Sequence, residues 1–306
     1  MINFASKPLF LAPMAGFSDL PFRAVVKKFG ADLTISEMIS ANALVFEAKK
    51  TLKMLEKHES ESPFIVQIAG NDENIIKKAV QILNEFDFIN GIDLNCGCPM
   101  PKIIKQNAGA ALLRDLPRLK NLVSTIKDNS KKPYTSVKFR LGFDEKHPAA
   151  IARACEDAGA DFIAIHARTA KQLYRGNADY AGILETKEAV KIPVITNGDI
   201  NGDNFKAVLA ATKADALMIG RGCVGKPWLF YEIKSGKSVS QALKKEMILY
   251  HFEAMLAHYG EFGVRLFRKH LHEYSKGIAG ASKFREFANH TDSPSAMREG
   301  IEGFFG

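Results

Sequence analysis

Eight short apolar runs are spaced between residues 9 and 222, and a helix-like segment follows each of them. Each run ends in a polar residue or a glycine. The runs are LFLAPMAG (9–16), LTISEM (33–38), FIVQIAG (64–70), GIDLNCG (91–97), TSVKFRLG (135–142), FIAIHAR (162–168), PVITNGD (193–199) and ALMIGRG (216–222). Strands that alternate with helices form parallel sheets. The pattern therefore predicts an α/β fold, a (β/α)8 TIM barrel, with an open doubly wound sheet as the alternative.

The strand pattern stops near Ser240, and the rest of the sequence has helical periodicity. Three amphipathic segments cover residues 240–260, 264–277 and 282–290. The stretch IKSGKSVS (233–240) before them is rich in Gly, Ser and Lys, which is typical of a linker. We expect a catalytic barrel domain over residues 1–235 and a small C-terminal helical domain over residues 236–306.

The composition indicates which kinds of partner and which cellular compartment to expect. The net charge of +8 favours a polyanionic partner, and nucleic acid ranks first among these. Four cysteines in 306 residues are too few for a disulfide framework, so reduced thiols are expected. No run approaches the ~18 apolar residues that span a membrane, and the first residues do not resemble a signal peptide. We expect a cytoplasmic protein that binds no membrane.

Strand alternation predicts where polar side chains point. In residues 136–142, the apolar Val137, Phe139 and Leu141 share one face, so Lys138 and Arg140 point into the barrel. The same rule assigns to the inner face Gln67, Asp93, Asn95, His166, Arg168, Asn197 and Asp199. One polar residue at a strand end is commonly a satisfied structural group. Polar residues from five strands indicate an active site at the C-terminal mouth.

Two glycine-containing turns indicate a phosphate site. NGDINGDN (197–204) follows the seventh run and GRG (220–222) follows the eighth, where barrel enzymes commonly hold a phosphate. Arg221 could add a charged hydrogen bond, and Asp203 is expected to cap the next helix. The glycine patterns of Rossmann and P-loop nucleotide sites do not follow a strand.

The segment DLNCGCP (93–99) contains two cysteines with different environments. Cys96 continues the outward apolar face, and we interpret it as a packing residue. Cys98 lies beyond the strand, in a turn that could present its sulfur at the mouth. A zinc site is not expected, because no second ligand pair accompanies the two thiols and Cys155 lies in a helical segment. A disulfide between residues two apart would be strained.

These residues resemble the motifs of the tRNA-dihydrouridine synthases. The resemblance covers nearly the whole chain and rests on APMAG (12–16), PFR (21–23), SEM (36–38), VQIAG (66–70), DLNCGCP (93–99), GAALLRD (109–115), VKFRLG (137–142), IHART (165–169), NGDI (197–200), IGRG (219–222) and RKHLHEYSKG (268–277). Many members have tryptophan where this chain has Glu273, which puts the details of RNA docking in question.

The resemblance implies an enzyme that holds FMN and reduces uridine in tRNA to 5,6-dihydrouridine, with NADPH or NADH as reductant. Hydride passes from the reduced flavin to C6 of the base, and Cys98 donates a proton to C5. A thiol with a usual pKa of ~8.5 is mostly protonated at neutral pH. The resemblance assigns FMN contacts to Pro13, Met14, Ala15, Gln67, Lys138, His166, Asn197, Gly198, Asp199, Gly220 and Arg221.

RNA contacts are expected at the mouth and on one helix. The target base must leave its stack, so Asn95 is a candidate for binding its edge and Arg168 for binding a nearby phosphate. On a helix, one basic stripe comprises Arg265, Arg268, Lys269, His272 and Lys276, at positions i, i+3, i+4, i+7 and i+11. The opposite face comprises Phe267, His270, Leu271, Tyr274 and Ile278.

Other functions stay open at this point. A barrel flavoenzyme acting on a small molecule, such as a dihydroorotate dehydrogenase or an enoate reductase, would share Lys138 and the phosphate turns. A lyase that forms a Schiff base at Lys138 would be colourless. A non-catalytic RNA-binding barrel is the third alternative. We expect a monomer without a metal ion.

Overall fold

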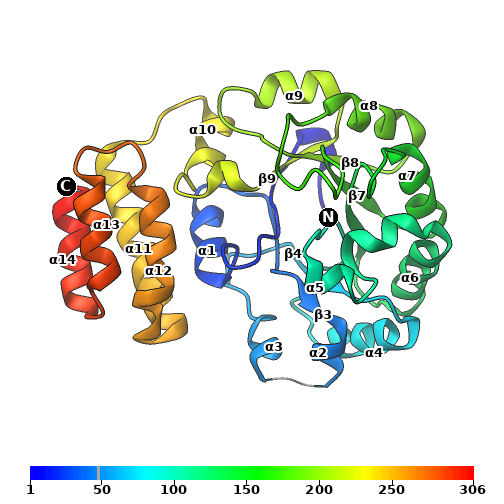
Figure 1. The fold of residues 1–306 in the computed structure, drawn as a ribbon, viewed down its shortest axis with the longest axis horizontal. Helices are drawn as coiled ribbons and strands as arrows, with labels where there is room; N and C mark the ends of the chain where they lie inside the picture. The colour runs from blue at the N-terminus through cyan, green and yellow to red at the C-terminus, as the bar shows by residue number, and fades with distance from the viewer. Residues whose placement is uncertain (47–48) are drawn as a thin grey trace.

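The structure is a computed structural model that describes residues 1–46 and 49–306. Its strands are β1 (Leu9–Leu11), β2 (Leu33–Ile35), β3 (Ile39–Ser40), β4 (Phe64–Ala69), β5 (Gly91–Cys96), β6 (Tyr134–Arg140), β7 (Phe162–His166), β8 (Val194–Asn197) and β9 (Ala216–Ile219). All the pairings are parallel, in the order β2-β1-β9-β8-β7-β6-β5-β4-β3, and a further β2–β4 pairing closes the barrel. The predicted (β/α)8 barrel is confirmed (Figure 1).

The eight predicted strands are all present, and most end earlier than the apolar runs that predicted them. Of the run at residues 33–38, only the first three residues form a strand, β2, which pairs with the start of β4; the two-residue β3 follows the run and pairs with the end of β4. Short strands leave the polar residues that follow them in loops above the barrel. The mouth is therefore built largely from loops, and the strands set where these loops begin.

Helices cover the outside of the barrel. They are α1 (Leu20–Lys28), α2 (Ala41–Val45), α3 (Lys49–Lys53), α4 (Glu73–Asn84), α5 (Pro101–Ile104), α6 (Leu116–Asn129), α7 (Pro148–Asp157), α8 (Tyr180–Ala189), α9 (Phe205–Thr212) and α10 (Leu229–Ser235). Side-chain caps fix several of their starts, as at Asp72, whose carboxylate accepts a bond from the Ile75 N–H. The expected cap at Asp203 is wrong: Asn204 precedes α9, and the Asn201 side chain accepts the N–H groups of Asp203 and Asn204 instead.

The two faces of each strand pack as alternation predicts. Val137, Phe139 and Leu141 belong to the large apolar cluster between the sheet and the helices. Ala164 and Ile195 belong to a smaller cluster inside the barrel. At the N-terminal end of the barrel, the short 3-10 helix η1 (Phe4–Ser6) brings the Phe4 ring against those of Phe10 and Phe162. The opposite end of the barrel is thus left for the polar residues.

The C-terminal helices are α11 (Gln241–Tyr259), α12 (Phe262–Tyr274), α13 (Ala281–His290) and α14 (Pro294–Phe304). They form a bundle beside α1, at the left of Figure 1, and α11 packs on α1. The last helix, α14, was not singled out from the sequence. One apolar cluster runs from Phe22 of α1 and Leu217 of β9 to Phe252, Phe267 and Met297 of the bundle. The bundle is therefore packed on the barrel. In the part of the chain that the structure describes, no helix combines the length and the apolar character needed to cross a bilayer.

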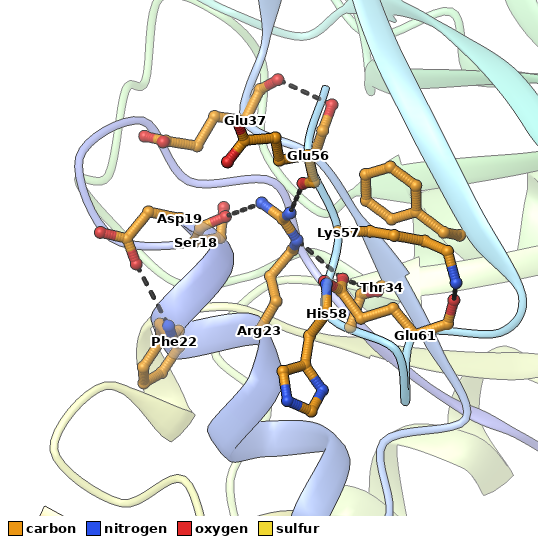
Figure 2. Close-up of polar contacts among 12 residues, drawn as sticks. Ser18, Asp19, Phe22, Arg23, Thr34, Glu37, Glu56, Lys57, His58 and Glu61 are labelled. Carbon is orange, nitrogen blue, oxygen red and sulfur yellow. Dashed lines mark hydrogen bonds and ion pairs between the residues drawn. The ribbon is translucent and has the colours of Figure 1, made fainter. Parts of the chain in front are cut away.

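A buried ion pair, which no pattern in the sequence predicts, joins α1 to the segment before β4 (Figure 2). The Arg23 Nε lies 2.8 Å from the Glu61 Oε2, and both side chains are almost fully buried. Arg23 also donates to the carbonyl groups of Ser18 and Glu56, and the Thr34 hydroxyl donates to Glu61. Removing one partner of such a pair leaves a buried charge without compensation, which costs about 3–5 kcal/mol.

Candidate active site

A cavity of about 400 Å³ opens at the C-terminal ends of the strands. Its lining includes every residue predicted to contact the cofactor: Pro13, Met14, Ala15, Gln67, Lys138, His166, Asn197, Gly198, Asp199, Gly220 and Arg221. Cys98 and Asn95 line the same cavity, whereas Arg168 and the five residues of the basic stripe do not. The structure thus brings together residues from seven strand ends in one chamber.

Hydrogen bonds hold the turn that carries Cys98. The Asn95 Oδ1 accepts the Cys98 N–H at 2.9 Å, and its Nδ2 donates to the Gln67 Oε1 at 2.7 Å. Gln67 in turn donates to the buried Asp93, which also accepts the Ser136 hydroxyl. This chain of polar contacts fixes the start of the turn from within the barrel.

Gly109 holds the other side of the turn. Its φ is +61°, and a Cβ at this position would lie 2.8 Å from the Cys98 carbonyl oxygen. The Ala110 N–H donates to the same carbonyl at 3.0 Å. The turn is therefore gripped from two sides, which leaves the Cys98 thiol little freedom to change place.

The two neighbouring cysteines lie in opposite environments. Cys96 is fully buried among apolar side chains between sheet and helices, and burial raises the pKa of its thiol well above the usual value. Cys98 is partly exposed and lines the cavity. Only Cys98 is placed to meet a ligand.

Lys138 carries a positive charge into the floor of the cavity. Its Nζ donates to the Asn197 Oδ1 at 3.0 Å, and the Asn197 Nδ2 donates to the Met218 carbonyl. Burial, and secondarily the charge of Arg140, lower the pKa of Lys138 to about 8, while Asp93 acts in the opposite sense. The lysine is thus mostly charged at neutral pH.

The part of the cavity lined by His166, Gly198 and Arg221 has the character of an anion site. The His166 Nδ1 is buried without a hydrogen-bond partner. Burial and four neighbouring cations lower the pKa of His166 to about 2, so the ring is neutral and can donate one N–H. Arg221 donates to Asp199 at 2.8 Å and remains half exposed. Gly198 has a φ of +124°, which favours glycine in this turn.

These residues fit a flavin mononucleotide. A cation beside an apolar strand end suits the electron-rich edge of an isoalloxazine ring, and the glycine turns with Arg221 suit a phosphate. The unpartnered nitrogen of His166 gives a further polar contact to a ligand. The cavity also lies within the usual size range for small-molecule sites.

Arg168, which the sequence analysis assigns to an RNA phosphate, is buried beneath the surface. It is 2% exposed, and its guanidinium bonds to Asp199 and to the carbonyl groups of Arg175 and Gly176. Its alternation partner His166 does face the cavity, but the chain has left the strand by Arg168. The geometry gives the expected phosphate contact no support, and Arg168 instead braces the 175–176 loop against Asp199.

The basic stripe on α12 is shorter than helical periodicity predicts, and several of its side chains are already paired with acidic residues. The helix ends at Tyr274, so Lys276 and Ile278 lie beyond it, and Lys276 pairs with Glu273 at 2.6 Å. Arg265 and Arg268 both bond to Asp292, which precedes α14. The prediction of one continuous stripe is wrong in this respect, because a period of 3.6 describes only the residues within the helix.

The remaining members of the stripe differ in position. His272 contacts the Asn289 side chain of α13. The Lys269 Nζ lies 5.4 Å from the ring centre of Phe17, which lines the cavity. Phe267, His270, Leu271 and Tyr274 are buried, as expected for the opposite face. Lys269 is therefore the stripe residue that stands at the rim of the cavity.

Two polar side chains that line the cavity, those of Arg140 and Tyr174, had no assigned role. Arg140, expected to point inward, donates to the Gly97 carbonyl at 2.8 Å and to the carbonyl groups of Thr169 and Leu173. It ties the Cys98 turn to the loop after β7. Tyr174 lies in this loop, with the Arg221 guanidinium 4.4 Å from its ring centre. Strand alternation predicts that Arg140 points inward, but Tyr174 lies in a loop, where no periodic pattern predicts its position.

The fold and the cavity define a class of protein, a (β/α)8-barrel enzyme with its active site at the C-terminal mouth. Among solved structures, an old yellow enzyme homologue from Zymomonas mobilis superposes with a TM-score of 0.57 and 13% identity, covering 77% of this chain and 90% of that one. The old yellow enzyme from Trypanosoma cruzi gives 0.57 at 8% identity, covering 76% and 89%. These likenesses confirm the barrel architecture.

The sequence identifies the family within that class. The family model described as dihydrouridine synthase matches residues 10–302, and the chain therefore belongs to the dihydrouridine synthase family. A probable tRNA-dihydrouridine synthase of Helicobacter pylori (strain ATCC 700392 / 26695) is 47% identical, over 99% of this chain and 94% of the relative. The tRNA-dihydrouridine synthase B of Vibrio parahaemolyticus is 39% identical, over 97% and 95%. The resemblance noted from the motifs is confirmed.

Proposed function

We propose that this protein reduces uridines in tRNA to 5,6-dihydrouridine, with bound FMN and with Cys98 as the proton donor. Membership of the dihydrouridine synthase family supports the reaction. The observation that carries the assignment of the acid is the cavity itself, where one partly exposed thiol shares a chamber with residues suited to a flavin. A small-molecule flavoenzyme, a Schiff-base lyase and a non-catalytic barrel are less compatible with this family.

FMN would be held without a covalent bond by the eleven cavity residues assigned above. When bound, it supplies the hydride that adds to C6 of the base. Pro13, Met14 and Ala15 would contact the ring through their backbone, with Gln67 at its edge. His166, Arg221 and the 197–199 turn would hold the phosphate. NADPH is the proposed reductant, with NADH as the alternative.

The protein's own residues would orient the base and supply the proton that follows the hydride. The Asn95 Nδ2 has two hydrogens, and Gln67 accepts one of them, so the other can bond to the edge of a flipped base. The same amide holds the Cys98 backbone. Binding of the base and placement of the acid would therefore depend on one side chain. The thiol gives its proton to C5.

The C-terminal helices would dock the rest of the tRNA. We propose that residues 1–235 form the catalytic domain and residues 236–306 the RNA-binding domain. Gly236, in the left-handed region, follows α10 and ends the last barrel helix. The stripe residues Arg265, Arg268, Lys269, His272 and Lys276 would face RNA phosphates, with Lys269 nearest the mouth. For Arg168 we propose a positioning role, through its bonds to Asp199 and the 175–176 loop.

Reconstitution tests this function. We expect the purified protein to show the visible absorption of a flavin, or to acquire it on incubation with FMN. With unmodified tRNA and NADPH it should form dihydrouridine, detectable as a gain of two hydrogens in nucleoside mass spectrometry. NADH in a parallel reaction measures the preference for the reductant. A protein that stays colourless with FMN, or that oxidises dihydroorotate or reduces an enoate but leaves tRNA unchanged, would contradict the proposal.

A further inference from the structure

Three buried side chains with metal-ligand chemistry meet where the barrel joins the C-terminal helices. They are Asp19, which caps α1, His251 in α11 and His270 in α12. One carboxylate oxygen and one nitrogen from each ring lie within 4.8 Å of one another. None of the three lines the cavity at the mouth. The group is thus separate from the proposed active site.

Among the described residues, the histidine rings in this group have nitrogen atoms without hydrogen-bond partners. These atoms are the His251 Nε2 and both nitrogens of His270, and both rings are fully buried. A buried polar atom without a partner costs roughly 1–3 kcal/mol. Buried polar groups in native proteins almost always have a partner. Three ring nitrogens without partners, grouped with one carboxylate, indicate that a ligand completes the set.

The other atoms of the group are fixed by outer contacts. The Tyr274 hydroxyl lies 3.0 Å from the His251 Nδ1, which leaves the Nε2 lone pair for a ligand when Nδ1 carries the proton. The Tyr259 hydroxyl donates to the Asp19 Oδ2 at 3.2 Å. The Phe22 N–H donates to the Asp19 Oδ1, a contact drawn in Figure 2. Metal-binding histidines and carboxylates are commonly oriented by such contacts.

We propose that Asp19, His251 and His270 bind one divalent transition-metal ion, with Zn²⁺ as the best match. Two imidazole nitrogens and one carboxylate oxygen form a common zinc ligand set, with a fourth position for water. Ligand atoms in a tetrahedral zinc site are roughly 3.3 Å apart. The earlier expectation of no metal considered the thiols and could not detect ligands so distant in sequence.

The charges around the group are compatible with a cation. Burial lowers the pKa of His251 to about 3 and that of His270 well below its usual value, so both rings are in the neutral, metal-binding form. Burial raises the pKa of the Asp19 carboxyl to about 6; the Phe22 N–H and Lys269 lower it, and Glu37 raises it further. A +2 ion at this site would be attracted by the Asp19 carboxylate and by the more distant Glu37, and repelled by Lys269.

The ion would act as a structural clamp. Asp19 follows directly on the 13–18 segment, whose first three residues line the cavity, while the two histidines belong to the helices proposed to dock tRNA. One ion would therefore fix the orientation of the bundle relative to the mouth. This role needs no participation in the redox reaction.

Metal content of the full-length, untagged protein tests the proposal. The protein is dialysed against Zn²⁺, passed through a desalting column and analysed by mass spectrometry of the elements. We expect about one Zn²⁺ per chain in the wild type. We expect at least a tenfold loss of affinity in His251→Gln, His270→Gln and Asp19→Asn, and a loss of about 10–100-fold in Tyr274→Phe, which removes only the outer contact to His251. His258→Gln, on the same helix α11 but outside the group, should bind Zn²⁺ as the wild type does.

The melting temperature is a second measurement, which tests the proposal even if some variants do not fold. EDTA should lower the melting temperature of the wild type, and added Zn²⁺ should restore it. His258→Gln should show the same response, whereas folded Asp19→Asn should show none. The proposal is overturned if wild type and Asp19→Asn retain equal zinc, or if the wild type holds no zinc and EDTA leaves its melting temperature unchanged. In that case a trapped water completes the group.

Discussion

The barrel mouth and the basic stripe on α12 were both predicted from periodicity, and they differ in how well that prediction holds. At the mouth, seven of the nine residues that strand alternation assigns to the inner face line one cavity, as do the eleven residues that the family resemblance assigns to the cofactor. On α12, two of the five stripe residues bond to Asp292, and Lys276 lies beyond the end of the helix. Periodicity predicted in which direction the side chains point in both regions. Only in the barrel did that direction also predict which residues lie next to one another.

The difference arises because the barrel is a closed sheet, whereas α12 is a helix on the surface. A strand in a closed parallel barrel has only two sides, and every inward residue near the C-terminal end meets the same chamber. A helix on the surface has one buried face, but its polar face can be covered by any later element. Here α13 supplies Asn289 to that face, and the loop before α14 supplies Asp292. The comparison predicts larger effects from changes at the mouth than on the stripe.

The largest effect is expected from Cys98→Ala. Loss of a general acid typically slows a reaction by about 10²–10⁴-fold, and FMN should stay bound because the turn is held through backbone atoms. Dihydrouridine formation at saturating tRNA and the flavin spectrum measure the two properties.

Cys96→Ala is the matched control for that change. It should keep activity and lose about 1 kcal/mol of stability from the apolar core. Activity lost in Cys96→Ala and kept in Cys98→Ala would reverse the assignment of the two thiols.

A smaller effect is expected from pH at Lys138. Its pKa of about 8 lies below the usual lysine value, so the side chain is charged below pH 8 and loses its proton above it. If that charge supports the flavin, FMN affinity is constant below pH 8 and falls by about tenfold per unit above it. Fluorescence titration of FMN from pH 6 to pH 9 measures this dependence.

Lys138→Met gives the control for the pH experiment. Its FMN affinity should be weaker at pH 7 and should not change between pH 7 and pH 9. A wild-type affinity that is flat over this range would show that the charge of Lys138 does not hold the cofactor.

The smallest effect is expected on the stripe. Arg268→Glu with Lys269→Glu should weaken tRNA binding, and each lost phosphate contact should reduce the salt slope by about one. Lys269→Gln alone should produce most of the change, because the Arg268 guanidinium is already bonded to Asp292. Binding is measured at several salt concentrations, with the exposed Lys283→Glu on α13 as control. Equal binding by the double variant and the wild type would make the stripe an ordinary polar surface.

Sequence reasoning predicted the barrel and the direction of its polar residues, because both follow from local periods. It did not find contacts between residues that are distant in the chain. The Arg23–Glu61 pair, the Tyr174 loop over Arg221 and the meeting of Asp19 with two histidines depend on tertiary packing. Arg168 shows the limit within one segment, since alternation ceased where the strand ended at His166. The roles of the cavity residues stay predictions until variants are measured.

The most direct test of the central claim is position-resolved mapping of dihydrouridine in cellular tRNA after deletion of the encoding gene. We predict loss of dihydrouridine at one or more defined positions, restored by the wild-type gene and not by Cys98→Ala. This result would also identify which uridine is reduced. Unchanged dihydrouridine at every position, in cells without a second member of the family, would contradict the account.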